Sequence, residues 1–448
     1  MDVSIIETSG LGDRSYLISA EGIGVVVDPQ RDIDRVLDLA RERGVRITHV
    51  LETHIHNDYV TGGLELSRAT GADYVVAAAD DVGFARHGIA DGDVIDAGPF
   101  RLQAMHTPGH THTHLSYVLH DGDTPVGVFT GGSMLHGTTG RTDLLGAEHT
   151  DTLTHAQYHS VRRLADELPG DVEVYPTHGF GSFCSATPAS GDSSTIADER
   201  RSNPALTLDE QSYVEELIAG LSAYPAYYAH MGVINTRGPA PVDLSMPTPV
   251  DPGELRRRID RGEWVVDLRH RRAFAAGHLA GSLGFELSTQ FVTYLGWLHA
   301  WGAPLTLIGE DADQIARARR ELVRIGVDEL SGAAAGAIEE LAAGQALRTY
   351  RVADFAELAE VAGADGVTVL DVRQRHEYDD GHVTGALNIP LHELGARLDE
   401  VPDGQVWVHC GSGYRASIAA SMLDRPGRSV VLVDDEFGNA ASDDRLVA

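Results

Sequence analysis

A segment near the N-terminus places metal-binding side chains at alternate positions. In THIHNDYVTGG, His54, His56 and Asp58 follow the apolar run ITHVLE and precede a turn rich in glycine. Imidazole and carboxylate groups are typical ligands of zinc and of non-haem iron. Two further histidines, His110 in MHTPGHTHTHLSY and His178 in VYPTHGFGSFC, also follow apolar runs that indicate strands. The pattern predicts a metal site assembled from several strand ends.

A second segment, QVWVHCGSGYRASIAA, predicts a sulfur-binding loop between a strand and a helix. The residues of this loop are Cys410, Gly411, Ser412, Gly413, Tyr414 and Arg415. Backbone N–H groups of a glycine-containing loop, together with a helix N-terminus, form a nest that favours anionic sulfur. We therefore predict that Cys410 is the nucleophile, that Arg415 adds a positive charge, and that residues 411–414 bind the substrate.

The elements that must position these residues alternate between strand and helix. Apolar runs such as GIGVVVDP and PVGVFTGG end in turn residues, and helical patterns separate them, which predicts an α/β domain. The polar stretch ATPASGDSSTIADERRSNP predicts a loop, and LDEQSYVEELIAGLSAYPAYYAHM predicts a helix after it. The Pro-rich GPAPVDLSMPTPVDPGE then predicts a linker, with a domain boundary near residue 247.

Beyond that boundary one sequence unit occurs twice. WVVDLRHRRAFAAGHLAG and TVLDVRQRHEYDDGHVTG share a D-[LV]-R motif followed by GH-x-x-G, which predicts two small domains in tandem. The predicted domains are residues 1–245, 249–345 and 346–448. No cysteine occurs between residues 185 and 409. The first repeat is therefore predicted to be inactive in covalent sulfur transfer and to serve in packing or docking.

Composition and charge narrow the partners. The chain has 67 acidic and 35 basic residues and a formal charge of -32, which argues against nucleic acid and anionic membrane surfaces. No basic N-terminal region precedes an apolar core, and no apolar stretch approaches the roughly 18 to 20 residues that span a bilayer. The two cysteines, Cys184 and Cys410, lie far apart, which favours a reducing compartment. We expect a cytoplasmic protein.

The first region resembles the metallo-β-lactamase superfamily, whose pattern is H-x-H-x-D-H, then TPGH-T, then FTGD and a final histidine. The resemblance covers roughly residues 1 to 245 and implies an αββα sandwich. The combination of TPGHT, FTGG and GRTDL with a following rhodanese unit is most similar to the persulfide dioxygenase branch. In that branch a single iron oxidises a thiol-bound persulfide with O2.

The resemblance also assigns ligands. His54, His56 and His110 match the first metal position, whereas Asp58 and His178 match the second. A three-histidine set suits a non-haem iron or a catalytic zinc with open positions.

Two departures from the family pattern bear on the number of metals. Tyr59 stands at the position of a second-site histidine, and Gly132 replaces the aspartate of FTGD. Because glycine has no donor atom, the second site loses two ligands, and we predict one metal, iron or alternatively zinc. Nearby, His114 is predicted to orient a ligand, Asp143 to cap a turn, and Cys184 to be a buried structural thiol in preference to a ligand.

The last region, roughly residues 347 to 448, resembles the rhodanese family through its C-x-x-G-x-R loop and DVR…GH-x-x-G frame. In that family the loop cysteine accepts sulfane sulfur and passes it to a nucleophile. Phosphatases use a similar loop, usually with five residues between Cys and Arg, whereas CGSGYR has the four of rhodaneses. The segment VLVDDEFGNAA departs from the usual glycine-aromatic ending.

Both regions indicate one chemistry. We predict that a low-molecular-weight thiol persulfide is oxidised by O2 to sulfite at the metal, and that Cys410 exchanges sulfane sulfur with an acceptor thiol. Two alternatives stay open: a zinc thioester hydrolase of the hydroxyacylglutathione type, and a sulfur carrier whose first domain is a degenerate platform. The identity of the thiol, the direction of sulfur flow and the oligomeric state, a homo-oligomer included, are open.

Overall fold

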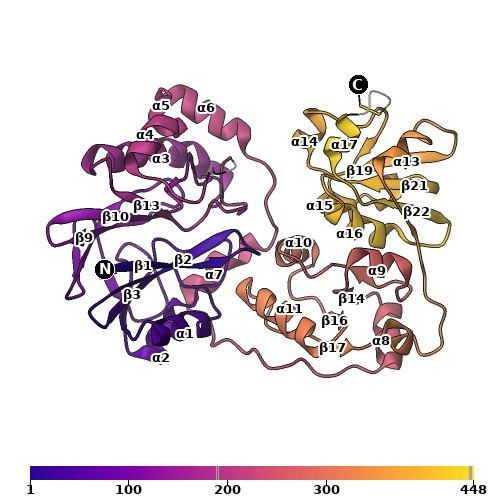
Figure 1. Cartoon of the computed structure of the whole chain (residues 1–448), viewed down its shortest axis with the longest axis horizontal. Helices are drawn as coiled ribbons and strands as arrows, with labels where there is room; N and C mark the ends of the chain where they lie inside the picture. The colour runs from indigo at the N-terminus through magenta and orange to yellow at the C-terminus, as the bar shows by residue number, and fades with distance from the viewer. Residues whose placement is uncertain (188, 190, 443–445, 448) are drawn as a thin grey trace. The chain divides into compact units, whose positions relative to one another are not determined.

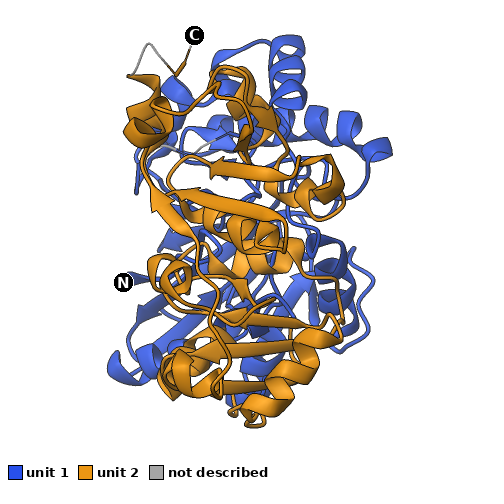
Figure 2. Ribbon diagram, turned by 90° about the vertical axis from the view of Figure 1, so that its right-hand side faces the viewer, with its two compact units in different colours: residues 1–243, 321–326 blue, residues 244–320, 327–448 orange. Residues whose placement is uncertain are grey.

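A computed structural model describes residues 1–187, 189, 191–442 and 446–447. They form two compact units, which Figure 2 colours separately: residues 1–243 with 321–326, and residues 244–320 with 327–448. The three-domain division given above stays a prediction.

Two facing β-sheets form the centre of the first unit. One has the order β1 (Asp2–Thr8), β2 (Asp13–Ala20), β3 (Ile23–Val27), β4 (Arg46–Leu51), β5 (Asp73–Ala77) and β6 (His87–Ile89). The other has the order β13 (Glu173–Pro176), β10 (Thr124–Gly131), β9 (Leu115–Asp121), β8 (Arg101–His106) and β7 (Val94–Asp96). A short hairpin pairs β11 (Met134–Leu135) with β12 (Thr138–Thr139).

Helices cover the outer face of each sheet (Figure 1). Helices α1 (Asp34–Glu42) and α2 (Gly63–Thr70) lie on the first sheet. The second sheet is covered by α3 (Ala147–Glu167), α4 (Ile196–Ser202), α5 (Pro204–Thr207) and α6 (Glu210–Gly220), and α7 (Tyr228–Arg237) follows in the chain. The predicted αββα sandwich is confirmed.

Burial explains this layering. Strand β3 and nearly all of β2 are buried on both faces, whereas β1 alternates between exposed and buried residues, as an outer strand does. Between the sheets, aromatic rings from different strands interlock: Tyr16 lies 5.2 Å from Phe129, centroid to centroid, at an angle of 60°. Such edge-to-face packing favours a unique sheet-on-sheet arrangement.

The loops that carry the candidate ligands are joined to one another by backbone hydrogen bonds. The N–H of Leu115 donates to the carbonyl of Thr53 over 2.8 Å, next to His54. The N–H of Thr177, next to His178, donates to the carbonyl of Gly131 over 3.0 Å. Ends of strands from both sheets therefore meet where the histidines lie.

Two predictions of local structure were wrong. The polar stretch predicted as a loop contains α4, which begins after Thr195 with a capping box formed with Asp198. Residues 188 and 190 of that stretch lie outside the described residues. The single helix predicted after it is interrupted between α6 and α7, where residues 221–225 precede a new turn at Tyr227.

The second unit contains two parallel sheets. The first repeat has the order β15 (Leu283–Gly284), β14 (Trp264–Asp267), β16 (Leu305–Gly309) and β17 (Gly332–Ala335). Its helices are α8 (Pro252–Asp260), α9 (Arg271–Ala276), α10 (Phe291–Leu298), α11 (Ala312–Arg324) and α12 (Ile338–Leu341).

The second repeat has the order β18 (Arg351–Ala353), β22 (Arg428–Val433), β21 (Gly404–His409), β19 (Val367–Asp371) and β20 (Leu387–Asn388). Its helices are α13 (Phe355–Ala359), α14 (Arg375–Asp379), α15 (Leu391–Leu394), α16 (Tyr414–Leu423) and α17 (Phe437–Ala441), with a 3-10 turn, η1, at Leu398–Glu400.

The repeated sequence frame forms the same contacts twice. In each repeat the arginine of D-[LV]-R pairs with the aspartate two residues earlier and donates to the carbonyl of the glycine in GH-x-x-G. The Asp–Arg distances are 2.7 Å for Asp267–Arg269 and 2.6 Å for Asp371–Arg373. The bonds to the Gly277 and Gly381 carbonyls measure 2.8 and 2.7 Å. The frame is therefore a structural clamp that both repeats share.

Among the described residues, the helices are all too short or too polar to span a bilayer. A cytoplasmic location stays a prediction.

Candidate metal centre and cysteine loop

Four buried imidazoles that the sequence predicts as ligands lie together where the strand ends meet, and a fifth buried ring, His114, stacks on His54 with ring centroids 4.9 Å apart. The ring of His54 is 4.1 Å from His56, 4.8 Å from His110 and 5.3 Å from His178, centroid to centroid. All four side chains are at most 1% exposed. The sequence-predicted histidines are thus brought to one place.

Two of these rings have their Nδ1 occupied by a neighbouring group, which leaves Nε2 to face the cluster. Nδ1 of His54 lies 2.8 Å from Oγ1 of Thr53, and Nδ1 of His110 lies 2.8 Å from the carbonyl of Arg141. Nε2 of His110 is buried without a hydrogen-bond partner among the described residues. Anchoring one nitrogen fixes the tautomer and the ring orientation, as partners of metal-binding histidines do.

The protonation states agree with this arrangement. Burial and the neighbouring His56 hold the pKa of His54 well below its usual range, and burial and His178 lower the pKa of His110 to about 3. Both rings are therefore neutral near pH 7, which is the form that binds metal ions.

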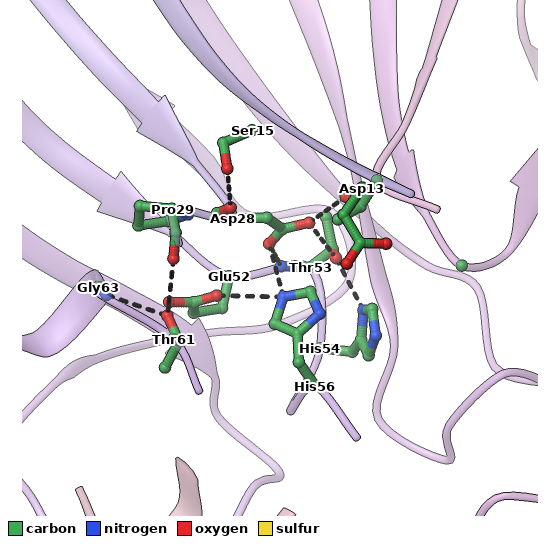
Figure 3. A network of polar contacts seen from close by, with 12 residues as sticks. Asp13, Ser15, Asp28, Pro29, Glu52, Thr53, His54, His56, Thr61 and Gly63 are labelled. Atoms are coloured by element: carbon green, nitrogen blue, oxygen red, sulfur yellow. Dashed lines mark hydrogen bonds and ion pairs between the residues drawn. The ribbon is translucent and has the colours of Figure 1, made fainter. Parts of the chain in front are cut away.

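His56 is held by two carboxylates (Figure 3). Its Nε2 lies 3.3 Å from both Asp28 Oδ1 and Glu52 Oε2, and Tyr59 Oη lies 3.0 Å from the same nitrogen. Burial disfavours the cation, yet Asp28 and Glu52 raise the pKa of His56 to about 9. Its Nδ1 has no hydrogen-bond partner in the described part of the chain. The network thus favours the imidazolium form, and Nδ1 must lose its proton before it can bind a metal ion.

Asp28 organises this network from an unusual backbone conformation. Its φ is 50°, in the left-handed region that aspartate tolerates better than most residues. The carboxylate accepts bonds from the Thr53 N–H and hydroxyl, each over 2.7 Å, and from the Thr177 hydroxyl. One side chain therefore fixes the loops of both His54 and His178 while it binds His56.

His178 occupies a more central place than the sequence predicted. Its Nδ1 lies 2.9 Å from Asp13 Oδ1 and 3.1 Å from Asp58 Oδ2, while its Nε2 lies 3.3 Å from Nε2 of His54. Against the effect of burial, Asp58 and Asp13 raise the pKa of His178 to about 10.

Donor atoms within 4.8 Å of one another define overlapping groups around this ring. His54, His56 and His178 form one such group, and His110, His178 and Cys184 form another. Asp58, a predicted second-site ligand, groups with Asp13 and His178. Because His178 belongs to all three groups, it links the two predicted metal positions.

Gly132 and Tyr59 shape the second position. A Cβ atom on Gly132 would lie 2.3 Å from Cδ2 of His110, so the imidazole fills the space that a side chain would need. Tyr59 is fully buried and stacks on His56, with ring centroids 4.3 Å apart. The two departures from the family pattern therefore remove donor atoms and fill their volume.

These residues offer donor atoms for a metal ion. Among the described residues, the donor atoms of His54, His56 and His178 lie within 4.8 Å of one another, whereas the predicted ligand His110 groups with His178 and Cys184 instead. The fold and this cluster together indicate a metal site.

Sequence reasoning missed several supporting residues. Arg141, whose carbonyl orients His110, is fixed by Asp143 through bonds of 2.7 and 2.8 Å. Asp13 and Glu52 also escaped notice. The GRTDL motif could have indicated a role for Arg141. Asp13 and Glu52 stand outside any motif, so the sequence offered no indication of their role. Cys184 is buried near His110, and burial raises the pKa of its thiol.

The cysteine loop has the predicted local structure. Cys410 follows β21 and is 1% exposed, and α16 begins at Tyr414. Gly413 adopts φ 86°, which a non-glycine residue rarely does. The unpaired N–H groups at the start of α16 thus lie next to the loop.

Arg415 does not present a free charge to that loop. Both of its terminal nitrogens bind the carboxylate of Glu377 on α14, one of them over 2.7 Å. Although burial opposes it, Arg415 lowers the pKa of Glu377, so the pair is ionised. The positive charge expected of Arg415 is therefore balanced.

Comparison with known proteins agrees with this architecture. The family model of the metallo-beta-lactamase superfamily matches residues 11–178. Persulfide dioxygenase ETHE1, mitochondrial, of Homo sapiens is 32% identical over 247 residues, which cover 55% of this chain and 83% of that protein. The chain belongs to the metallo-β-lactamase superfamily. The superfamily match includes β2, β4, β8, β10 and β13 and all four clustered histidines.

A second family model matches part of the second unit, and further relatives match other shares of the chain. The rhodanese-like domain model matches residues 354–439, which contain Cys410. The crystal structure of a metallo-beta-lactamase from Staphylococcus aureus subsp. aureus COL has a TM-score of 0.68 and 27% identity, and covers 75% of this chain and 99% of its own. A hydroxyacylglutathione hydrolase of Polaromonas sp. strain JS666 is 28% identical, over a match that covers 45% of this chain and 84% of the hydrolase. A rhodanese identity for the first repeat stays a prediction.

Proposed function

We propose that this chain oxidises a low-molecular-weight thiol persulfide with O2 to sulfite at a single metal ion, iron in preference to zinc, and moves sulfane sulfur through Cys410. The coarser statement, an enzyme of sulfur metabolism, is supported by the persulfide dioxygenase relative and the rhodanese-like domain. The more specific proposal, persulfide oxidation, rests on one observation: imidazole nitrogens converge in the same chain that contains a rhodanese-type cysteine loop.

In this proposal a redox-active metal such as iron supplies the centre at which O2 and a persulfide react. His54, His56 and His110 would hold it, and the other nitrogen of each ring is already engaged by a neighbouring group. These contacts orient the rings before the metal arrives, which reduces the reorganisation that binding requires. The buried setting excludes bulk water from the reacting sulfur.

The mass balance of the proposed reaction shows which proton the neighbouring side chains must accept. Oxidation of a persulfide anion to sulfite takes both atoms of O2 and one oxygen of water, and it releases the thiol and a proton. Asp13 is suited to hold that proton, because burial and the neighbouring Asp58 raise its pKa to about 7. Tyr59 helps to orient the His56 ring, because its hydroxyl contacts Nε2 of that ring.

Cys410 provides the second activity. Its thiolate attacks the outer sulfur of a persulfide, and the electron pair of the broken S–S bond leaves with the donor thiolate. The new persulfide on Cys410 then passes its outer sulfur to an acceptor thiol by the same exchange. The loop N–H groups and the start of α16 stabilise the anionic sulfur in both steps.

Gly132 favours a second candidate, a sulfur carrier whose first unit has no metal chemistry. The ring of His110 occupies the space of the missing carboxylate, so the ligand set is poorer than the family pattern. Zinc thioester hydrolysis is supported only by the similarity to hydroxyacylglutathione hydrolase.

Oxygen uptake with a glutathione persulfide substrate tests these candidates. The test uses iron-loaded full-length protein and its His110→Ala and Cys410→Ser variants, with the exposed His112→Ala as the matched control. Persulfide oxidation predicts uptake that His110→Ala abolishes and Cys410→Ser and His112→Ala retain. Uptake that survives His110→Ala overturns the assigned site. Protein that returns free of metal but transfers sulfur supports the carrier.

A further inference from the structure

The donor groups around the histidine cluster include a thiol that the proposed reaction does not use. A ring nitrogen of His110, a ring nitrogen of His178 and Sγ of Cys184 all lie within 4.8 Å of one another. The three side chains are 0% exposed. Nε2 of His110 has no hydrogen-bond partner among the described residues, while its Nδ1 is held by the carbonyl of Arg141. A buried, unpartnered nitrogen and a thiol are therefore close enough to share one cation.

Arg141 fixes two of these donors at once. Its backbone N–H donates to the carbonyl of Cys184 over 2.8 Å, and its own carbonyl lies 2.8 Å from Nδ1 of His110. Its guanidinium also donates to the carbonyl of Phe183 over 3.1 Å, and the N–H of Cys184 donates to Oγ of Ser182 over 3.1 Å. The thiol and the imidazole are thus oriented by one residue, as donors of a metal site must be.

The third donor is anchored from the turn before β2. Asp13 Oδ1 lies 2.9 Å from Nδ1 of His178, which leaves Nε2 of that ring as the nitrogen for a cation. The same turn contacts the segment that leads to Cys184, because the N–H of Phe180 donates to the carbonyl of Gly12 over 3.1 Å. His178 and Cys184 are therefore held by one pair of contacting loops.

Gly132 explains why a sulfur donor would be needed here. The family pattern has an aspartate at this position, and the ring of His110 fills the space that its side chain would occupy. A thiolate carries the same single negative charge as the absent carboxylate, so Cys184 can restore the charge of the donor set without any atom at position 132. Two imidazoles and one thiolate suit zinc, cobalt and ferrous ions better than magnesium or calcium.

We propose that Cys184 is a thiolate ligand of the metal ion, beside His110 and His178, and that it takes the place of the carboxylate absent at position 132. This assignment differs from the structural thiol predicted from the sequence. It rests on the proposed metal site and adds one donor to it. When the cation binds, an S–metal bond replaces the S–H bond of Cys184, and the proton is released to solvent.

Cobalt substitution of the full-length protein tests the proposal, because Co²⁺ bound to a thiolate has a strong charge-transfer absorption in the near ultraviolet that histidine and carboxylate ligands do not produce. Metal-free wild type, Cys184→Ser and Cys410→Ser are titrated with Co²⁺ without oxygen, and competition with a chelator gives the affinities. Cys410→Ser is the matched control, since it makes the same substitution at the only other cysteine of the chain. X-ray absorption of zinc-loaded wild type provides a reading that needs no variant.

We expect the absorption band in wild type and Cys410→Ser and its loss in Cys184→Ser, with an affinity at least about a hundredfold lower, because contacts outside a ligand set already contribute about ten- to a hundredfold. Zinc-loaded wild type should show a sulfur neighbour at about 2.3 Å.

Cobalt that binds wild type without the band, a band that persists in Cys184→Ser, or a zinc site without sulfur overturns the proposal and leaves the proposed oxidation standing. Wild type that binds neither ion overturns both. A band in protein that consumes no oxygen with persulfide supports the thiolate ligand and contradicts only the proposed reaction.

Discussion

The histidine cluster and the cysteine loop are built in opposite ways. The cluster draws its rings from distant parts of the chain, and His54 and His178, which lie 3.3 Å apart, are separated by 124 positions. The cysteine loop is continuous from Cys410 to Arg415, between β21 and α16, and its predicted anion site is formed by its own backbone. The cluster therefore depends on the side chains that orient each ring, whereas the loop depends mainly on its own conformation.

Cys410→Ser should have the largest effect. The serine hydroxyl cannot carry sulfane sulfur, so we expect transfer from thiosulfate to cyanide to fall at least about a thousandfold. The metal content of the first unit should not change. A parallel measurement of bound metal checks this independence, and a coupled loss of metal would contradict the contrast between the two sites.

Asp28→Asn should weaken metal binding by the histidine cluster, although none of the predicted ligands is substituted. Asparagine tolerates the left-handed backbone at this position, so the change removes charge while it preserves shape. We expect metal affinity to fall about ten- to a hundredfold, as for other groups that orient metal-binding histidines. Competition with a chelator measures the affinity. An unaltered value would show that His56 does not need Asp28, since Glu52 remains as its carboxylate partner.

Glu377→Gln tests how the charge of Arg415 affects the reactivity of Cys410. The substitution leaves the Arg415 guanidinium without its anionic partner, so more positive potential reaches Cys410. We expect iodoacetamide to alkylate Cys410 faster at neutral pH, by up to about tenfold. If the rate stays the same while the protein remains folded, Arg415 acts only as a structural support.

Asp424→Asn should have the smallest effect, present above about pH 4 and lost in acid. Asp424 joins the two repeats by pairing with His278 over 3.0 Å and with Arg348. Although burial opposes it, these partners lower the pKa of Asp424 from 3.8 to about 2.

A lowered folded-state pKa stabilises the protein above pH 3.8, and this contribution disappears as the pH falls through about 2. We expect Asp424→Asn to cost less than about 1 kcal/mol at pH 5, because solvent screens part of the interaction. The urea midpoint of the variant should converge with that of wild type near pH 2. Persistent separation of the midpoints at that pH would argue against an electrostatic cause.

The same contrast explains what the sequence could reveal. The cysteine loop was predictable because its chemistry, its glycines and its following helix are contiguous. The histidines were predictable as ligand types, but the hold of Asp28 and Glu52 on His56 depends on folding, since neither carboxylate stands in a motif. Helix α4 was missed because its sequence is polar, although Thr195 and Asp198 carry the spacing of a capping box.

The tight packing of His110 over Gly132 has a consequence for protein engineering. A carboxylate cannot be installed at position 132 by a single substitution without a clash, because the first side-chain carbon of aspartate would overlap the imidazole. A designed second donor set would therefore need a compensating change that moves the His110 ring.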